Sequence, residues 1–213
     1  MKIGIIGATG RAGNRIMEEA LERGHEVTAI VRNAGKVTHE HKEVDILQKD
    51  IFELTLADLE ELNVVVDAFG APVEESENHV KSLDHLVELL SGTTSPRLIV
   101  VGGAGSLHVD EAGSLLLDTK GMREAPYYPT AKAQTEQLEH LRKASHQLSW
   151  TYISPGAMFE PGEKTGKYQV GEDHLLFDKD GNSFISMEDY AVALLDEIEK
   201  PQHLNKRFTV ANG

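Results

Sequence analysis

Short apolar runs alternate with longer amphipathic segments along most of the chain. The runs have the length of strands and are apolar at consecutive positions, which is typical of parallel strands buried on both faces. They predict strands at 2–7, 27–31, 44–47, 64–69, 98–101, 149–153 and 207–210, with another near Phe184. Apolar residues spaced three and four apart predict helices at 11–23, 54–62, 77–90, 129–144 and 188–199, and Gly24 follows the first of these as a terminating glycine. The alternation predicts the α/β class, with a doubly wound parallel sheet in a single domain over 1–213.

Two long segments interrupt the alternation. Residues 104–127 and 155–182 are irregular, and the second is rich in Gly, Pro and charge. They follow the fifth and sixth predicted strands, which places them at the carboxyl edge of the sheet, where ligands bind in open α/β folds. Long loops in a compact domain are usually functional. We therefore expect a small C-terminal substrate-side region there.

The charge of the chain limits its partners. The 213 residues carry a formal net charge of −14, and both nucleic acid and anionic membrane surfaces repel such an acidic protein. The chain has no cysteine, which excludes disulfides, thiolate catalysis and Cys-ligated metals. No apolar stretch is long enough to span a bilayer, and the first residues predict a strand rather than a signal peptide. We expect a cytoplasmic protein whose partner is a small molecule, and its oligomeric state is open.

Three glycines lie between the first predicted strand and the first predicted helix, in the pattern G-x-x-G-x-x-G. Gly7 permits a tight turn, Gly10 lets the backbone approach a pyrophosphate, and Gly13 lets the helix pack close to the sheet. The helix N-terminus offers N–H groups and a positive dipole end to phosphates. The strand–loop–helix setting predicts a dinucleotide-binding loop that consists of Gly7, Thr9, Gly10, Arg11, Ala12 and Gly13.

The loop sequence GATGRAG resembles that of the atypical short-chain dehydrogenase/reductase proteins. Further matching pieces are VTAIVRN, VVGGAGSL, YYPTAKAQTEQLE and SPGAMFEPGEKTGKY, and the resemblance covers essentially the whole chain. Within these proteins the chain is most similar to the NADH-flavin reductase group, which is related to the NmrA-like and biliverdin reductase B proteins. The resemblance implies a Rossmann-type, NAD(P)-binding domain.

The residues after the second predicted strand bear on the choice between NAD and NADP. NAD-specific Rossmann proteins hold the ribose 2′-OH with an acidic residue there, whereas this chain has Arg32 and Asn33. Arg32 could pair with a 2′-phosphate through its planar guanidinium, and Arg11 could add a second charge. The sequence favours NADP, with NAD as the alternative. By analogy with the family, Asp50 and Ile51 are expected beside the adenine, unless Asp50 is an exposed loop acid.

Turns after two later strands complete the expected cofactor site. Phe69, Gly70 and Ala71 follow the fourth strand, where a glycine lets the backbone run close to the cofactor's ribose. After the sixth strand, the resemblance implies that the Pro-Gly turn lies against the nicotinamide and that Met158 and Phe159 form an apolar wall. Ordinary turns with core side chains are the alternative at both places. The second turn consists of Pro155, Gly156, Ala157 and Met158.

Tyr128 and Lys132 have the Y-x-x-x-K spacing by which short-chain dehydrogenases let a lysine lower the pKa of a proton-donating tyrosine. Four residues apart on a helix, the two side chains emerge on one face. In related proteins a serine after the fifth strand completes the set, but here glycines come first and Ser106 follows them. Alternatively, Lys132 holds a cofactor ribose and Tyr128 only lines the pocket. Hydride transfer to a flavin depends on close stacking more than on a positioned acid.

Three functions are therefore open. The first is an NAD(P)H-dependent reductase of a flavin or another small conjugated acceptor, with flavin as a substrate. The second is a redox sensor that binds the dinucleotide without turnover, and the third is a carbonyl reductase or epimerase-type enzyme that uses Tyr128 and Lys132. No metal site is expected, because the run His39, Glu40 and His41 is more typical of a solvated approach to a strand.

Overall fold

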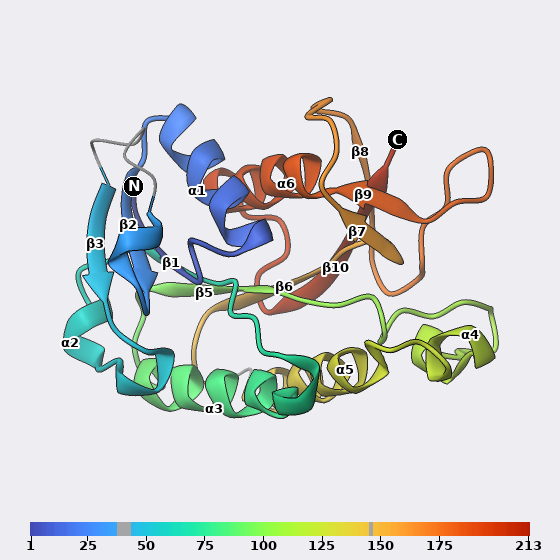
Figure 1. The fold of residues 1–213 in the computed structure, drawn as a ribbon, viewed down its shortest axis with the longest axis horizontal. Coiled ribbons are helices and arrows are strands. Elements are labelled where there is room, and N and C mark those ends of the chain that lie inside the picture. The colour runs from blue at the N-terminus through green and yellow to red at the C-terminus, as the bar shows by residue number, and fades with distance from the viewer. Residues whose placement is uncertain (38–43, 145–146) are drawn as a thin grey trace.

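An eight-stranded sheet forms the centre of the computed structural model, which describes residues 1–37, 44–144 and 147–213 (Figure 1). The strands follow the order β3-β2-β1-β4-β5-β6-β10-β8, and all neighbours are parallel except β10 and β8. The order reverses between β1 and β4, which makes this the switch point of a doubly wound Rossmann-type sheet and confirms the predicted fold class. The strands are β1 (Lys2–Ile6), β2 (Glu26–Val31), β3 (Val44–Gln48), β4 (Val64–Asp67), β5 (Arg97–Val101), β6 (Trp150–Ser154), β8 (Tyr168–Gly171) and β10 (Lys206–Asn212).

Helices cover the sheet on both faces. Figure 1 shows α1 (Arg11–Glu22) and α6 (Met187–Glu199) on one face, and α3 (Asn78–Leu90) and α5 (Tyr128–Lys143) on the other. Successive side chains of a strand point to opposite faces. Val64 and Val66 therefore join the core on the α1 and α6 side, whereas Val65 joins the core on the α3 and α5 side. Burial on both faces explains why the strands are apolar at consecutive positions.

The helix predicted at 54–62 is present but shorter, as the four-residue helix α2 (Leu56–Leu59), and a separate 3-10 turn at Ile51–Glu53 precedes it. Each of these begins with its own capping box, at Asp50 and at Thr55. A residue that caps a helix lies outside it, so the cap at Thr55 excludes residues 54 and 55 from α2 and separates it from the preceding turn.

The irregular segments 104–127 and 155–182 contain short elements that the sequence pattern did not predict. The first includes a 3-10 turn at Leu116–Asp118 and α4 (Lys120–Arg123), and the second includes β7 (Met158–Glu160) and β8. β7 pairs in parallel with β9 (Phe184–Ser186), separately from the main sheet. Within the described part of the chain, no helix is long and apolar enough to cross a membrane.

Candidate functional site

A cavity of about 840 Å³ opens at the carboxyl ends of the central strands, where the strand order reverses. Its volume is typical of small-molecule sites, and segments after β1, β2, β4, β5 and β6 line it. Most of the residues that the sequence analysis assigned to a cofactor meet there. Those that line the cavity are Gly7, Thr9, Gly10, Arg11, Ala12, Arg32, Asn33, Ile51, Phe69, Gly70, Ala71, Pro155, Gly156, Ala157 and Met158.

The three glycines of the first loop have distinct positions. Gly7 has φ +75°, and a Cβ there would lie 2.5 Å from the carbonyl oxygen of Ala68. Gly10 faces the cavity and donates its N–H to the Gly7 carbonyl oxygen at 2.8 Å. Gly13 is not among the cavity-lining residues, and a Cβ there would lie only 2.2 Å from the Gly7 carbonyl oxygen. Its role is therefore to let α1 pack directly on the loop.

The N-terminus of α1 is open toward the cavity. Gly10 is the N-cap, no side chain caps the helix, and its first turn contains no acidic residue. The first N–H groups of a helix have no carbonyl partner within it, and here Arg11 and Ala12 line the cavity. An uncapped helix N-terminus that faces a cavity binds phosphate readily. The residues present therefore fit the pyrophosphate of a dinucleotide.

Basic side chains gather at the part of the cavity beside β2 and β3. Arg32, Lys36 and Lys49 all line it. The Asn33 side chain accepts a hydrogen bond from Gly35 N at 3.0 Å and caps a short turn at Ala34–Lys36. Both Asn33 and Lys36 line the cavity. Lys49 is already bound to Asp58 at 2.7 and 2.8 Å. The structure places no ion pair on Arg32 or Lys36 from any residue it describes.

Two of the charged residues assigned to the cofactor have partners within the protein. Arg11 lines the cavity, but it forms an ion pair with Glu160 at 3.1 Å, so its charge is partly compensated. Asp50 does not line the cavity, because its carboxylate accepts a hydrogen bond from Phe52 N at 3.0 Å and caps the following turn. Its neighbour Ile51 is buried and faces the cavity instead.

The structure does not bring Tyr128 and Lys132 to the cavity. Tyr128 is the first residue of α5, and it packs against a small cluster that includes Leu117 and Met122. Lys132 lies one turn later and is exposed. Successive helical residues are rotated by about 100°, and it is Tyr127, half exposed at the start of the helix, that lines the cavity.

Ser106 also lies outside the cavity lining. It is buried, and its hydroxyl oxygen is 3.2 Å from Nη1 of Arg207. The loop after β5 instead presents four small residues to the cavity, which are Gly102, Gly103, Ala104 and Gly105. The cavity therefore contains no Ser-Tyr-Lys set from the residues that the sequence suggested.

A histidine that the sequence analysis did not single out lines the cavity. His79 is in the first turn of α3, is buried, and meets the Phe69 ring edge-on with the centroids 5.7 Å apart. Burial lowers the pKa of His79, so it is neutral near pH 7. At the end of β4, Asp67 accepts a hydrogen bond from Phe69 N at 3.1 Å, and burial raises the pKa of Asp67 to about 6. No local sequence pattern marks His79 as a cavity residue, because its place there depends on how α3 packs against the sheet.

The possible metal-binding run of His39, Glu40 and His41 lies outside the described residues. Among the residues that are described, no group of three His, Asp or Glu side chains has a metal-binding arrangement.

Comparison with known proteins agrees with this geometry. The model of the NAD(P)H-binding family matches residues 7–201. The uncharacterized protein YwnB of Bacillus subtilis (strain 168) is 50% identical over 100% of this chain and 99% of its own length. A solved structure from Streptococcus pneumoniae TIGR4, of a protein proposed to be an NADH-flavin reductase, is 42% identical, with a TM-score of 0.91 and full coverage of both chains. A proposed epimerase from Bacteroides thetaiotaomicron is 35% identical with a TM-score of 0.85, covering 99% of this chain and 96% of that one. The chain belongs to the NAD(P)H-binding family.

Proposed function

We propose that the protein is an NAD(P)H-dependent reductase that transfers a hydride to a flavin or another small conjugated acceptor. The observation that carries this proposal is the chemistry of the cavity after β5 and β6. The lining there is mostly glycine, alanine and apolar side chains, and its polar residues are Tyr127, Thr130, Gln134 and Glu160. It does not include Ser106, Tyr128 or Lys132, the proton-donating set that carbonyl reduction would use. Such a surface favours an acceptor that receives a hydride without a positioned acid.

Two half-exposed apolar side chains flank this end of the cavity. Ala131, one turn after Tyr127, lies against Gly105, where an added Cβ would be 3.0 Å from the Ala131 carbonyl oxygen. Tyr127 therefore lies beside the loop after β5, and Met158 follows the turn after the neighbouring strand β6. Their exposed fractions are 52% and 50%, so both side chains are accessible to a ligand in the cavity. Aromatic and thioether groups both pack well on flat rings, which supports a planar acceptor.

The opposite part of the cavity would hold the dinucleotide. Bound NAD(P)H supplies the hydride. The open N-terminus of α1 would bind its pyrophosphate, and Ile51 and Phe69 offer apolar surface to its adenine. Arg32 and Lys36 would pair with a 2′-phosphate, which supports NADPH over NADH as the preferred donor.

The protein from Streptococcus pneumoniae is proposed to be an NADH-flavin reductase, and its full-length similarity supports the same reaction here. The proposed epimerase among the relatives is a weaker guide for this chain. Tyr128 and Lys132, the pair that such chemistry would use, do not line the cavity.

The test is a titration of the purified protein with NADPH and with NADH, followed by addition of FMN under turnover conditions. We expect tighter binding of NADPH and oxidation that depends on the flavin. Binding of the dinucleotide without turnover, with flavins and quinones alike, would contradict the reductase and favour a redox sensor. Failure to bind either dinucleotide would overturn the function proposed for the glycine loop.

A further inference from the structure

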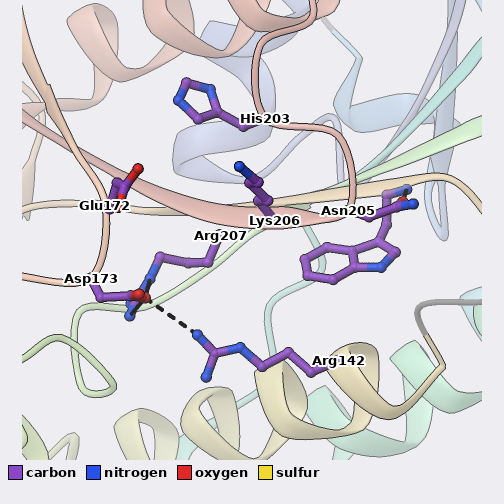
Figure 2. A pocket seen from close by; sticks show the side chains of 8 residues that line it. Arg142, Glu172, Asp173, His203, Asn205, Lys206 and Arg207 are labelled. Carbon is purple, nitrogen blue, oxygen red and sulfur yellow. Dashed lines mark hydrogen bonds and ion pairs between the residues drawn. The ribbon is translucent and has the colours of Figure 1, made fainter.

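Three separate segments meet at one buried guanidinium. Arg207, the second residue of β10, has a side chain that is only 2% exposed. Its Nη1 lies 3.2 Å from the hydroxyl of Ser106 and 3.3 Å from that of Ser154, and its Nη2 donates to the Ser106 carbonyl oxygen at 3.4 Å. Its Nε and Nη2 both donate to one carboxylate oxygen of Asp173, with Nε at 2.8 Å. Figure 2 shows Arg207 and Arg142 converging on Asp173, which also binds Arg142 at 3.3 Å.

The first of these segments is the loop that forms one wall of the proposed acceptor site. Three of its four cavity-lining residues are glycines, which have great backbone freedom and no side chains that could fix them. Backbone hydrogen bonds hold both ends of the loop, since Gly102 N donates to the Ile153 carbonyl oxygen and Leu117 N donates to that of Gly105, each at 2.9 Å. Two side chains from other segments add further polar contacts. Gly103 N donates to the Tyr152 hydroxyl at 3.2 Å, and Arg207 holds Ser106 at the other end of the glycines.

The second segment leads into another wall of the cavity. Ser154 immediately precedes the turn from Pro155 to Met158 that lines the cavity. Besides the contact with Arg207, its carbonyl oxygen accepts a hydrogen bond from the Thr209 hydroxyl at 3.0 Å. Arg207 of β10 therefore contacts Ser106, just after the glycine loop that lines the cavity, and Ser154, just before the turn that lines it.

Only an arginine can make this set of contacts. The guanidinium carries five N–H donors in a fixed planar fork, so it can serve a carboxylate, a carbonyl and two hydroxyls together. A lysine at the same place keeps the charge but has three donors on a single nitrogen. The Arg207→Lys variant would leave the charge pair with Asp173 possible and release part of the contact to the two serines.

We propose that Arg207 is a positioning residue, which sets the spacing between the two loops that form the acceptor end of the cavity. This proposal rests on the reductase function proposed above. Arg207 itself does not line the cavity. Its loss should therefore affect the acceptor more than the dinucleotide, whose glycine loop and basic residues lie on other segments.

The first test compares Arg207→Lys with Arg97→Lys. Arg97 is a matched control, because it is also a buried arginine, and its partners Glu197 and Thr151 are not among the cavity-lining residues. For Arg207→Lys we expect a Kd for NADPH within about threefold of wild type, and a kcat/KM for flavin that falls about tenfold or more. For Arg97→Lys we expect a similar loss of thermal stability with kcat/KM nearly unchanged. Equal losses of kcat/KM in both variants would overturn the proposal and leave Arg207 with a stabilising role only.

The second test does not depend on turnover. Ser154→Ala removes one contact of Arg207 while its ion pair with Asp173 stays intact, so this variant is expected to fold. Amide hydrogen exchange should become faster in Arg207→Lys over residues 102–107 and 154–158, and in Ser154→Ala over 154–158 alone. Unchanged exchange in both loops would overturn the proposal. If the wild-type protein proves to have no reductase activity while the exchange changes as expected, the proposed function fails and the positioning role stands.

Discussion

Replacing Gly13 with alanine should weaken dinucleotide binding, because Gly13 is where α1 packs against the loop that precedes it. An added Cβ would lie 2.2 Å from the Gly7 carbonyl oxygen and 2.8 Å from its carbonyl carbon. Real Cβ atoms essentially never approach a heavy atom closer than 3.0 Å, so the helix and the loop must separate by about 0.8 Å. The obstructing atoms belong to the backbone and cannot rotate away as a flexible side chain could.

The separation has two effects of known size. Overpacking of this kind typically costs about 1–3 kcal/mol of folding free energy. The same movement displaces the N–H groups of Arg11 and Ala12 from the Gly7 end of the loop, and loss of one hydrogen bond to a charged group costs about 1.5–3 kcal/mol. Since about 1.4 kcal/mol corresponds to a tenfold change in Kd, NADPH should bind about 10- to 100-fold more weakly.

The assay is a fluorescence titration with NADPH, together with a thermal melt of the protein alone. Gly121→Ala is a suitable control, because Gly121 lies within α4 and a Cβ there would meet nothing within 4 Å. The control should keep the wild-type Kd and melt no lower than wild type. A folded Gly13→Ala protein that binds NADPH with the wild-type Kd would refute the reasoning.

Three further predictions concern the two ends of the cavity and the buried carboxyl group of Asp67. The double variant Arg32→Ala, Lys36→Ala should raise the Kd for NADPH at least about tenfold and leave that for NADH within threefold, since loss of an ion pair to a phosphate removes about 1.5–3 kcal/mol; equal losses for both dinucleotides in titration would contradict a 2′-phosphate site. Tyr127→Ala should raise the KM for flavin severalfold while Tyr128→Phe leaves steady-state kinetics nearly unchanged, and a reversal of this order would restore Tyr128 as the proton donor. Burial raises the pKa of Asp67 from 3.8 to about 6, so the folded protein binds more protons than the unfolded chain between these values and stability falls as the pH rises through them. Asp67→Asn should therefore stabilise the protein above pH 6 by up to about 3 kcal/mol, because each pKa unit corresponds to about 1.4 kcal/mol, and melts that show no greater gain at pH 7 than at pH 4 would contradict this.

The strands and the glycine loop could be predicted from the sequence because their signals are local. A fully buried parallel strand is apolar at consecutive positions, and Val64, Val65 and Val66 of β4, which are all buried, show this directly. The turn at Gly7 needs a positive φ, and Gly10 and Gly13 need room for backbone contacts, so glycine itself marks these positions. For the same reason, most of the residues expected around the dinucleotide do line one cavity.

The acceptor end could not be predicted in the same way, because its geometry depends on contacts between distant segments. The i, i+4 spacing of Tyr128 and Lys132 fixes only that they share a face of α5, and the packing of Tyr128 on Leu117 and Met122 decides which way that face points. Ser106 is held away from the cavity by Arg207, 101 residues further along the chain. Neither contact has a signature in the local sequence.

The glycine at the end of β5 also constrains how this protein could acquire a new reaction. A Cβ at Gly102 would lie 2.0 Å from the Tyr152 ring. A side chain can therefore replace Gly102 only after Tyr152 has been replaced by a smaller residue. Tyr152 in turn donates its hydroxyl proton to the Gln134 carbonyl oxygen at 2.9 Å and accepts from Gly103 N, so shrinking it first loosens the wall. Each single step is therefore unfavourable before the pair is complete. A serine can enter the lineage at position 102 only through a coupled pair of substitutions, and this ordering tends to preserve the present chemistry over evolutionary time.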